Sequence, residues 1–257
     1  MIKLINIGME YDGKEVLHDI NLSVKQGETV AIIGPSGSGK STLLRLMVGL
    51  AKPTTGEILI NDEEISKYKE DALNKVRLKM GMVFQYSALF DSLSVGENVA
   101  FGLRQHTDLS NKDIQEIVKE KLKMVGLVGK ENFMPNQLSG GMKKRVSLAR
   151  AIAINPQIIL YDEPTAGLDP IMSAIIDKTI MHTQKIIGGV SIIVTHNMAS
   201  AFAVADRIIM IYEGKIIEQG TTEEIKLSNN EIVQKFIGDY KNIKQLVHEN
   251  EVLDIED

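Results

Sequence analysis

The sequence of 257 residues contains no cysteine, which excludes a disulfide framework and any metal site built on thiolates. This composition suits a reducing compartment. Long apolar runs are also missing, because the longer ones, such as residues 158–161 and 208–212, are far shorter than the ~20 residues of a membrane-spanning helix. The first residues lack the apolar core of a secretion signal. We therefore expect any membrane role to depend on a partner protein.

Net positive charge is missing as well. The formal charge is −5, and residues 249–257, with five acidic residues and no Lys or Arg, account for all of it. The rest of the chain is balanced and has no general electrostatic attraction for nucleic acid, so we expect no nucleic-acid partner. The acidic tail is typical of a solvated chain end.

What the sequence does contain is one phosphate-binding loop. The segment GPSGSGKS at residues 34–41 follows an apolar run typical of a buried strand and precedes a predicted helix at residues 42–47. Glycines allow positive φ angles and bring backbone N–H groups against phosphate oxygens, while the lysine supplies a cation and the last serine a hydroxyl for Mg²⁺. The helix dipole also favours anions. The predicted nucleotide-binding residues are Gly34, Pro35, Ser36, Gly37, Ser38, Gly39, Lys40, Ser41 and Thr42.

Strand and helix patterns alternate along the chain and predict an α/β fold with a largely parallel sheet. Residues 2–11 and 15–25 are expected to form a hairpin, and the helical periodicity of about residues 86–155 predicts a helical insertion. Residues 230–247 also have helical spacing, and this helix could cover the core or contact a partner. Further strands are expected at residues 28–33, 56–62, 80–84, 158–161, 190–195 and 208–212, with a helix at 171–187.

Two adjacent carboxylates, Asp162 and Glu163, follow the apolar strand at residues 158–161. Ligands of open α/β sheets bind at strand ends, so these side chains are expected near the phosphate loop. We assign Asp162 to Mg²⁺, held directly or through water, and Glu163 to the general base that polarises the attacking water.

The segment LSGGMKKR at residues 138–145 lies between the phosphate loop and the two carboxylates in the sequence. It resembles the signature motif of ATP-binding-cassette (ABC) ATPases. The order of the motifs matches that family over about residues 1–225. The resemblance implies a phosphate-loop NTPase core with an antiparallel β subdomain and a helical subdomain inserted at about residues 86–155. A C-terminal helical extension and acidic tail, residues 226–257, would follow. It also implies Mg²⁺-dependent ATP hydrolysis.

Four further positions match the family one at a time. Tyr11 resembles the aromatic residue that stacks on adenine, and Gln85 the glutamine that contacts Mg²⁺ or water and senses the γ-phosphate. His196 matches the switch histidine that contacts the γ-phosphate, and residues 166–169 match the segment that crosses between subunits.

The signature residues Ser139, Gly140 and Gly141 begin a predicted helix. The family places this element opposite the phosphate loop of another subunit, so the resemblance implies a head-to-tail dimer of two copies with two ATP molecules at its interface.

Met142 stands where most of the family has glutamine. With residues 84–101 it resembles the Mla-type branch, ATPases of phospholipid-trafficking transporters that work with MCE proteins. This resemblance implies a peripheral protein on the cytoplasmic side of the inner membrane, with an integral-membrane permease docked near Ser87–Ser94. Leu89 and Phe90 could instead be core residues. A small-solute importer ATPase and a soluble ABC protein without a permease stay as alternatives.

Overall fold

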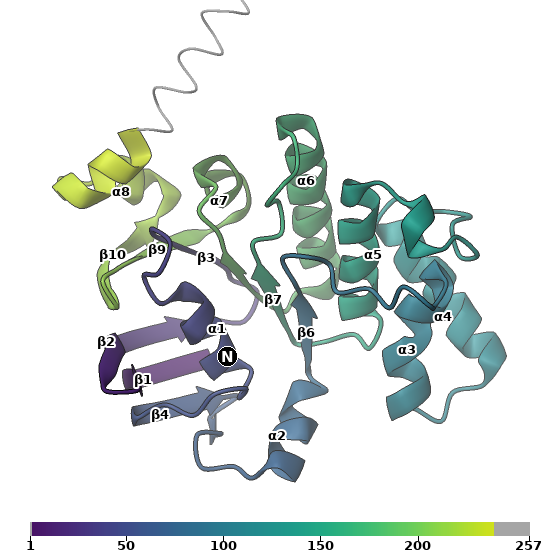
Figure 1. Ribbon diagram of the computed structural model, residues 1–257, viewed down its shortest axis with the longest axis horizontal. Coiled ribbons are helices and arrows are strands. Elements are labelled where there is room, and N and C mark those ends of the chain that lie inside the picture. The colour runs from purple at the N-terminus through teal and green to yellow at the C-terminus, as the bar shows by residue number, and fades with distance from the viewer. Residues whose placement is uncertain (1, 239–257) are drawn as a thin grey trace, which may run out of the picture.

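Short runs of apolar, mostly β-branched residues build the central sheet of the computed structural model, which describes residues 2–238 (Figure 1). The strand order is β10-β9-β3-β8-β7-β6. All neighbours pair in parallel except β9 and β10. β3 and β8 are buried along their whole length, as expected where both faces of a parallel sheet are covered. The strands are β3 (Thr29–Ile33), β6 (Met80–Val83), β7 (Ile158–Asp162), β8 (Val190–Val194), β9 (Arg207–Tyr212) and β10 (Lys215–Thr221). The prediction of a largely parallel sheet is confirmed.

A second, antiparallel sheet has the order β2-β1-β4-β5. Its strands are β1 (Ile2–Tyr11), β2 (Lys14–Val24), β4 (Thr55–Ile60) and β5 (Glu63–Glu64). The predicted hairpin of β1 and β2 is confirmed, with Tyr11 opposite Lys14 at its tip. Helix α1 (Lys40–Met47) shares one hydrophobic core with both sheets, and its Leu43 and Leu46 are fully buried there. The core therefore fixes the end of the phosphate loop between the two sheets.

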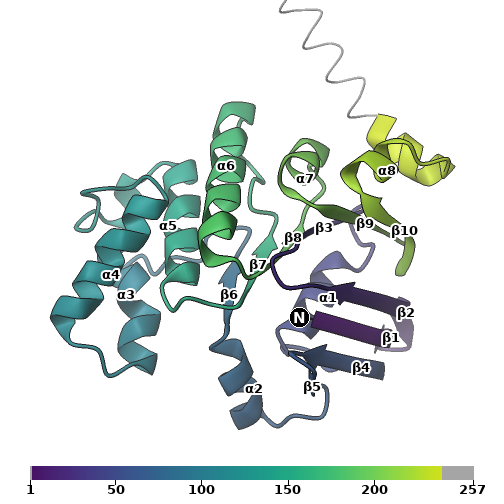
Figure 2. The same cartoon turned by 180° about the vertical axis from the view of Figure 1, so that it is seen from behind.

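Only helices and loops lie between β6 and β7 in the chain. They are α3 (Val95–His106), α4 (Asn111–Met124), the short 3-10 helix η1 (Pro135–Gln137) and α5 (Gly140–Ile152). Serine side chains cap the N-termini of α3, α4 and α5. Both views place these helices at the opposite end of the molecule from the antiparallel sheet (Figures 1 and 2). The predicted helical character of this segment is confirmed.

The remaining helices are α2 (Glu70–Arg77), α6 (Pro170–Ile187), α7 (Met198–Val204) and α8 (Thr222–Lys226). Residues 231–238 are also helical, and their Val233 and Ile237 are buried with Ile225 of α8, so this part of the predicted C-terminal helix covers the core. The rest of that helix and the acidic tail lie outside the described residues. The domain boundaries stay a prediction. Within residues 2–238, no helix is both long and apolar enough to span a membrane.

Candidate functional site

The phosphate loop joins β3 to α1 and is shaped by glycines that no other residue can replace. Gly34 and Gly39 have φ angles of 149° and 104°. A Cβ atom on Gly34 would lie 2.1 Å from the Ile211 carbonyl oxygen, and one on Gly39 would lie 2.5 Å from Leu17 Cδ2. Gly34 therefore requires glycine for both conformation and space, and Gly39 requires it for its conformation.

The loop offers several unused hydrogen-bond donors. The first backbone bond of α1 runs from the Leu43 N–H to the Gly39 carbonyl at 2.9 Å, and Gly39 has no side chain to cap the helix. The N–H groups of residues 40–42 therefore have no acceptor within the helix. The buried Ser38 Oγ also has no hydrogen-bond partner among the described residues. Such a cradle of donors fits the oxygens of a bound phosphate chain.

Lys40 is buried at the start of α1, with a relative exposure of 7%. Its Nζ donates to the carbonyl oxygens of Gly34, at 2.8 Å, and Pro35, at 2.9 Å. Burial lowers the pKa of Lys40, and the charges of Glu163 and Asp162 oppose that effect. The predicted phosphate loop and the predicted carboxylates thus lie within electrostatic range of each other.

Asp162 is the last residue of β7 and is partly buried. Burial raises the pKa of its carboxyl, and the neighbouring charge of Glu163 raises it further, while the cations of Arg45, Lys144 and Lys40 lower it. Burial and Glu163 outweigh the three cations, so the ionised form of Asp162 is left short of positive charge that a bound cation could supply.

Glu163 has a left-handed backbone conformation, with φ 48°, and its N–H donates to the Val194 carbonyl at 2.8 Å. Its carboxylate Oε1 lies 2.9 Å from His196 Nδ1. Its Oε2 accepts from Thr195 Oγ1, at 3.2 Å, and from the His196 N–H, at 3.3 Å. The structure therefore brings Glu163 and His196, which the sequence separates by 33 positions, into direct contact.

Gln85 follows the exit of β6, the neighbour of β7 in the sheet. Its backbone carbonyl accepts a hydrogen bond from Lys144 Nζ on α5, and the same Nζ lies 3.4 Å from the Glu163 carbonyl oxygen. Sequence reasoning did not select Lys144. Helical spacing places Lys144 on one face of α5 with the buried Gly141 and Leu148. This spacing was the one signal in the sequence that could have indicated a buried lysine.

Tyr11 lies at the end of β1, 41% exposed. The backbone of Val16 and the side chain of Leu17 on β2 lie directly against Gly39 of the phosphate loop. The hairpin that carries Tyr11 therefore borders the loop, and the exposed ring is free of the core packing that would exclude a stacking role.

Ser139 and Gly140 are exposed at the N-terminus of α5. Ser139 Oγ accepts from the Met142 N–H at 3.3 Å, which caps its own helix. Both views show α5 and α1 separated by β6, β7 and α6 (Figures 1 and 2). The structure thus does not bring the signature residues to the phosphate loop of the same chain.

The residues present fit Mg²⁺ and ATP. Ser41, Gln85 and Asp162 would supply a hydroxyl, an amide and a carboxylate, which are the oxygen ligands that Mg²⁺ prefers. Residues 2–238 hold no cluster of three or more His, Cys, Asp or Glu that could bind a metal without a substrate. Mg²⁺ is usually held through one or two carboxylates and substrate phosphates, which agrees with this composition.

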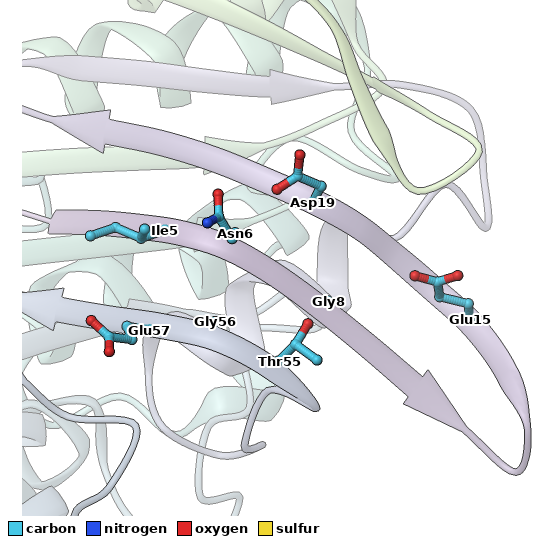
Figure 3. Close-up of a pocket in the computed structure, with 8 residues that line it drawn as sticks. All are labelled: Ile5, Asn6, Gly8, Glu15, Asp19, Thr55, Gly56 and Glu57. Atoms are coloured by element: carbon cyan, nitrogen blue, oxygen red, sulfur yellow. The ribbon is translucent and has the colours of Figure 1, made fainter.

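A shallow hollow on the antiparallel sheet is lined by the carboxylates of Glu15, Asp19 and Glu57 (Figure 3). None of the predicted site residues lines it. Its negative charge would repel nucleotide phosphates, so it is not part of the nucleotide site.

An apolar groove of about 890 Å³ lies where α2, β6, α3 and the end of α5 meet. Phe90 and Phe101 line it, with ring centroids 4.6 Å apart and exposures of 42% and 39%. Leu89, in contrast, is partly buried against the core of the helical segment. The segment Ser87–Ser94 therefore contributes Ala88 and Phe90 to the groove, and the core alternative applies to Leu89.

Comparisons with known proteins agree with this geometry. A family model described as ABC transporter matches residues 17–166. The chain is 42% identical to the chloroplastic protein TRIGALACTOSYLDIACYLGLYCEROL 3 of Arabidopsis thaliana, over 92% of this chain and 73% of that protein. It is 40% identical to the intermembrane phospholipid transport system ATP-binding protein MlaF of Haemophilus influenzae, over 92% of this chain and 90% of that protein.

A solved structure of the ATP-binding cassette MJ0796, a dimer in a post-hydrolysis state with ADP and Pi, superposes with a TM-score of 0.79. It is 37% identical and covers 86% of this chain and 99% of its own. The fold, the order of the motifs and these identities agree. The chain belongs to the ABC transporter family and is an ATP-binding subunit that hydrolyses ATP.

Proposed function

We propose that this ATPase drives the movement of phospholipids by a membrane transporter. The observation that carries the proposal is the 40% identity, over nearly the whole of both chains, to the ATP-binding protein of an intermembrane phospholipid transport system. The Mla-type sequence around Gln85 and the methionine at position 142 support the same cargo. The catalytic residues do not, because they would serve any cargo.

In this proposal the ATP phosphates bind the loop at residues 34–42. The N–H groups at the start of α1 and the Ser38 hydroxyl donate to phosphate oxygens, and Lys40 exchanges its carbonyl partners for phosphate. Tyr11 stacks on the adenine ring from the neighbouring hairpin.

Glu163 accepts a proton from the attacking water. Its carboxylate is oriented by Thr195 and His196, so the base enters the reaction in a fixed position. His196 contacts the γ-phosphate in this arrangement. A general base of this kind contributes about 10²- to 10⁴-fold to the rate.

Ser41, Gln85 and Asp162 hold Mg²⁺ in this proposal. The ion, when bound, offsets the negative charge of the phosphate chain. The pKa of Asp162 is raised although three cations lie near it, so a bound Mg²⁺ would stabilise the ionised carboxylate.

Each chain supplies two separate halves of a site. The signature residues Ser139, Gly140 and Gly141 are placed away from their own phosphate loop, and the Ser139 side chain is exposed. A second copy in head-to-tail orientation would set each signature helix opposite the other phosphate loop. The dimeric state of the related cassette MJ0796 supports this assembly.

A permease segment occupies the apolar groove beside Phe90 and Phe101 in this proposal. Ala88 and Phe90, which line the groove, follow Gln85 closely in the chain. A docked partner would therefore touch a segment that also carries a proposed Mg²⁺ ligand. The ATPase would then act peripherally on the cytoplasmic side of the inner membrane, together with an MCE-type lipid-binding protein. Pulling a phospholipid from a bilayer costs about 0.8 kcal/mol per exposed CH₂, so a sheltered route through partners is required.

The test reconstitutes the ATPase with its co-purified membrane partners in vesicles that contain labelled phospholipid. ATP-dependent transfer of label to acceptor vesicles or to an MCE-type protein is expected, and Glu163→Gln serves as the inactive control. Movement of an amino acid or an ion by the same complex, without lipid transfer under matched conditions, would support a small-solute importer instead.

A further inference from the structure

One buried lysine joins the exits of two neighbouring strands. Lys144 lies on α5 with a relative exposure of 6%. Its Nζ donates to the backbone carbonyl of Gln85, just beyond β6, and lies 3.4 Å from the backbone carbonyl of Glu163, just beyond β7. β6 and β7 pair in parallel, so a single ammonium group spans two adjacent segments that both carry predicted site residues.

The chemistry of this contact is specific. Both acceptors are backbone carbonyl oxygens, so Lys144 fixes the course of the main chain at both segments. An ammonium group has three N–H donors and can hold two carbonyls at once. A methionine of similar length would fill the space and hold neither.

The backbone at both ends of this bridge is in a conformation that needs support. Glu163 is left-handed, with φ 48°, and Ser87 and Ala88 after Gln85 have φ angles of 62° and 46°. Residues other than glycine keep such angles only where surrounding groups hold them. Arg150, also on α5, donates to the carbonyls of Ala88 at 2.6 Å and Ser87 at 2.9 Å. Lys144 and Arg150 of α5 therefore hold the backbone at Gln85 and Glu163 and at the two residues Ser87 and Ala88.

We propose that Lys144 is a positioning residue for ATP hydrolysis: it fixes the Glu163 backbone relative to Gln85, so that the carboxylate, held at its other end by Thr195 and His196, faces the phosphate loop. This inference rests on the proposed roles of Glu163 and Gln85. Small displacements of a positioned group lower the rate far more than they lower substrate binding.

The test compares Lys144→Met with Lys121→Met in the full-length chain, alone and with its co-purified membrane partners. Lys121 is a matched control, because it is a buried lysine of α4, 5% exposed, whose Nζ binds Asn155 at 2.8 Å and Glu120. We expect Lys144→Met to lower kcat by about 10- to 100-fold and to leave KM for ATP within about twofold. Lys121→Met should lower the melting temperature by a similar amount and leave kcat within about twofold.

The inference is overturned if Lys144→Met keeps kcat within twofold of the wild type, or if kcat falls equally in Lys121→Met. Lys144→Gln, which keeps a short donor, is read by the same criteria where Lys144→Met does not fold. If neither variant folds, Lys144 is needed for folding and the positioning role fails. If the wild-type protein hydrolyses ATP but moves no phospholipid, the proposed cargo is wrong, whereas the inference about Lys144 is unaffected.

Discussion

The phosphate loop and the signature helix α5 each present one buried lysine to the same two carboxylates, but the two lysines are held differently. Lys40 bonds to carbonyls five and six positions before it in its own loop. Lys144 bonds to carbonyls 59 positions before it and 19 positions after it, on two different strand exits. The Lys40 side chain can turn toward a ligand without moving another element. If Lys144 loses its hydrogen bonds, however, the backbone of Glu163 is no longer held. We therefore propose that Lys40 binds the nucleotide phosphates and that Lys144 fixes the backbone of the site.

The carboxylate that both lysines face gives the largest expected effect. Glu163→Gln keeps the shape of the side chain and removes its basicity, so turnover should fall by roughly 10²-fold or more while ATP binding is kept. Steady-state hydrolysis and binding of a fluorescent ATP analogue measure the two effects. Glu116→Gln, an exposed residue of α4, is the control. Near wild-type turnover in purified Glu163→Gln, with contaminating ATPase excluded, would remove Glu163 from the role of base.

Lys40→Ala tests the ligand side of the comparison. Loss of the ammonium group should weaken nucleotide binding by about 10- to 100-fold, because charge-assisted hydrogen bonds to phosphate are lost. Titration with the fluorescent analogue measures this, and Lys178→Ala on the exposed face of α6 is the control. Lys144→Met should leave the same binding constant unchanged. If Lys40→Ala and Lys144→Met weaken nucleotide binding equally, the proposed difference between a ligand-binding lysine and a positioning lysine is wrong.

The difference between these lysines also marks what the sequence could predict. Lys40 stands in a local pattern, in which glycine spacing and the flanking strand and helix identify the loop without any tertiary contact. Asp162 and Glu163 follow an apolar strand, which is again a local signal. The pairing of Glu163 with His196 was not derivable from spacing. The strand-end position predicted Glu163 near the phosphate loop, whereas only the family resemblance placed His196 at the γ-phosphate.

Other features depend on contacts between distant segments. The partners of Lys144 come from the approach of β6 and β7 to α5, which no local pattern encodes. The left-handed backbone angles at Ser87 and Ala88 are held by the Arg150 contacts. Neither residue is glycine, so the sequence gives no signal that predicts these angles. The division of the apolar cluster, with Leu89 inward and Phe90 outward, also appears only in three dimensions.

Phe90→Ala tests whether the apolar groove beside Arg150 contacts the permease. The Phe90 ring packs against the tilted Phe101 ring, and its centroid lies 5.8 Å from the Arg150 guanidinium. Truncation should weaken assembly with the permease by about 10-fold, since central aromatic residues often carry ~1–2 kcal/mol of an interface. Pull-down from detergent-solubilised membranes measures assembly, and nucleotide binding should not change. Leu109→Ala removes an equally exposed residue, 41% exposed, that does not line the groove. Full transporter association of folded Phe90→Ala would show that this ring is not a dominant contact.

The smallest expected effect concerns a buried charge of the opposite sign. Asp177 of α6 accepts a hydrogen bond from Ser200 Oγ of α7 at 2.9 Å, and its Oδ1 has no partner among the described residues. Ser200 Oγ lies 3.2 Å from Thr165 Oγ1, three positions after Asp162. Among the described residues, only the Ser200 hydroxyl donates to Asp177 and stabilises its charge, and burial raises its pKa to about 6.

Because the folded protein holds the proton of Asp177 more tightly than the unfolded chain, this residue lowers stability as the pH rises from about 4 to about 6, and the loss is complete above pH 6. Asp177→Asn removes the charge and should raise stability by roughly 1–2 kcal/mol at pH 7.5, a melting temperature about 2–8 °C higher. The gain should shrink to about half at pH 5. Thermal melts at both pH values measure it, with the exposed Asp108→Asn as control. A gain that does not depend on pH would mean that the amide improves packing, and that the charge of Asp177 is not the cost.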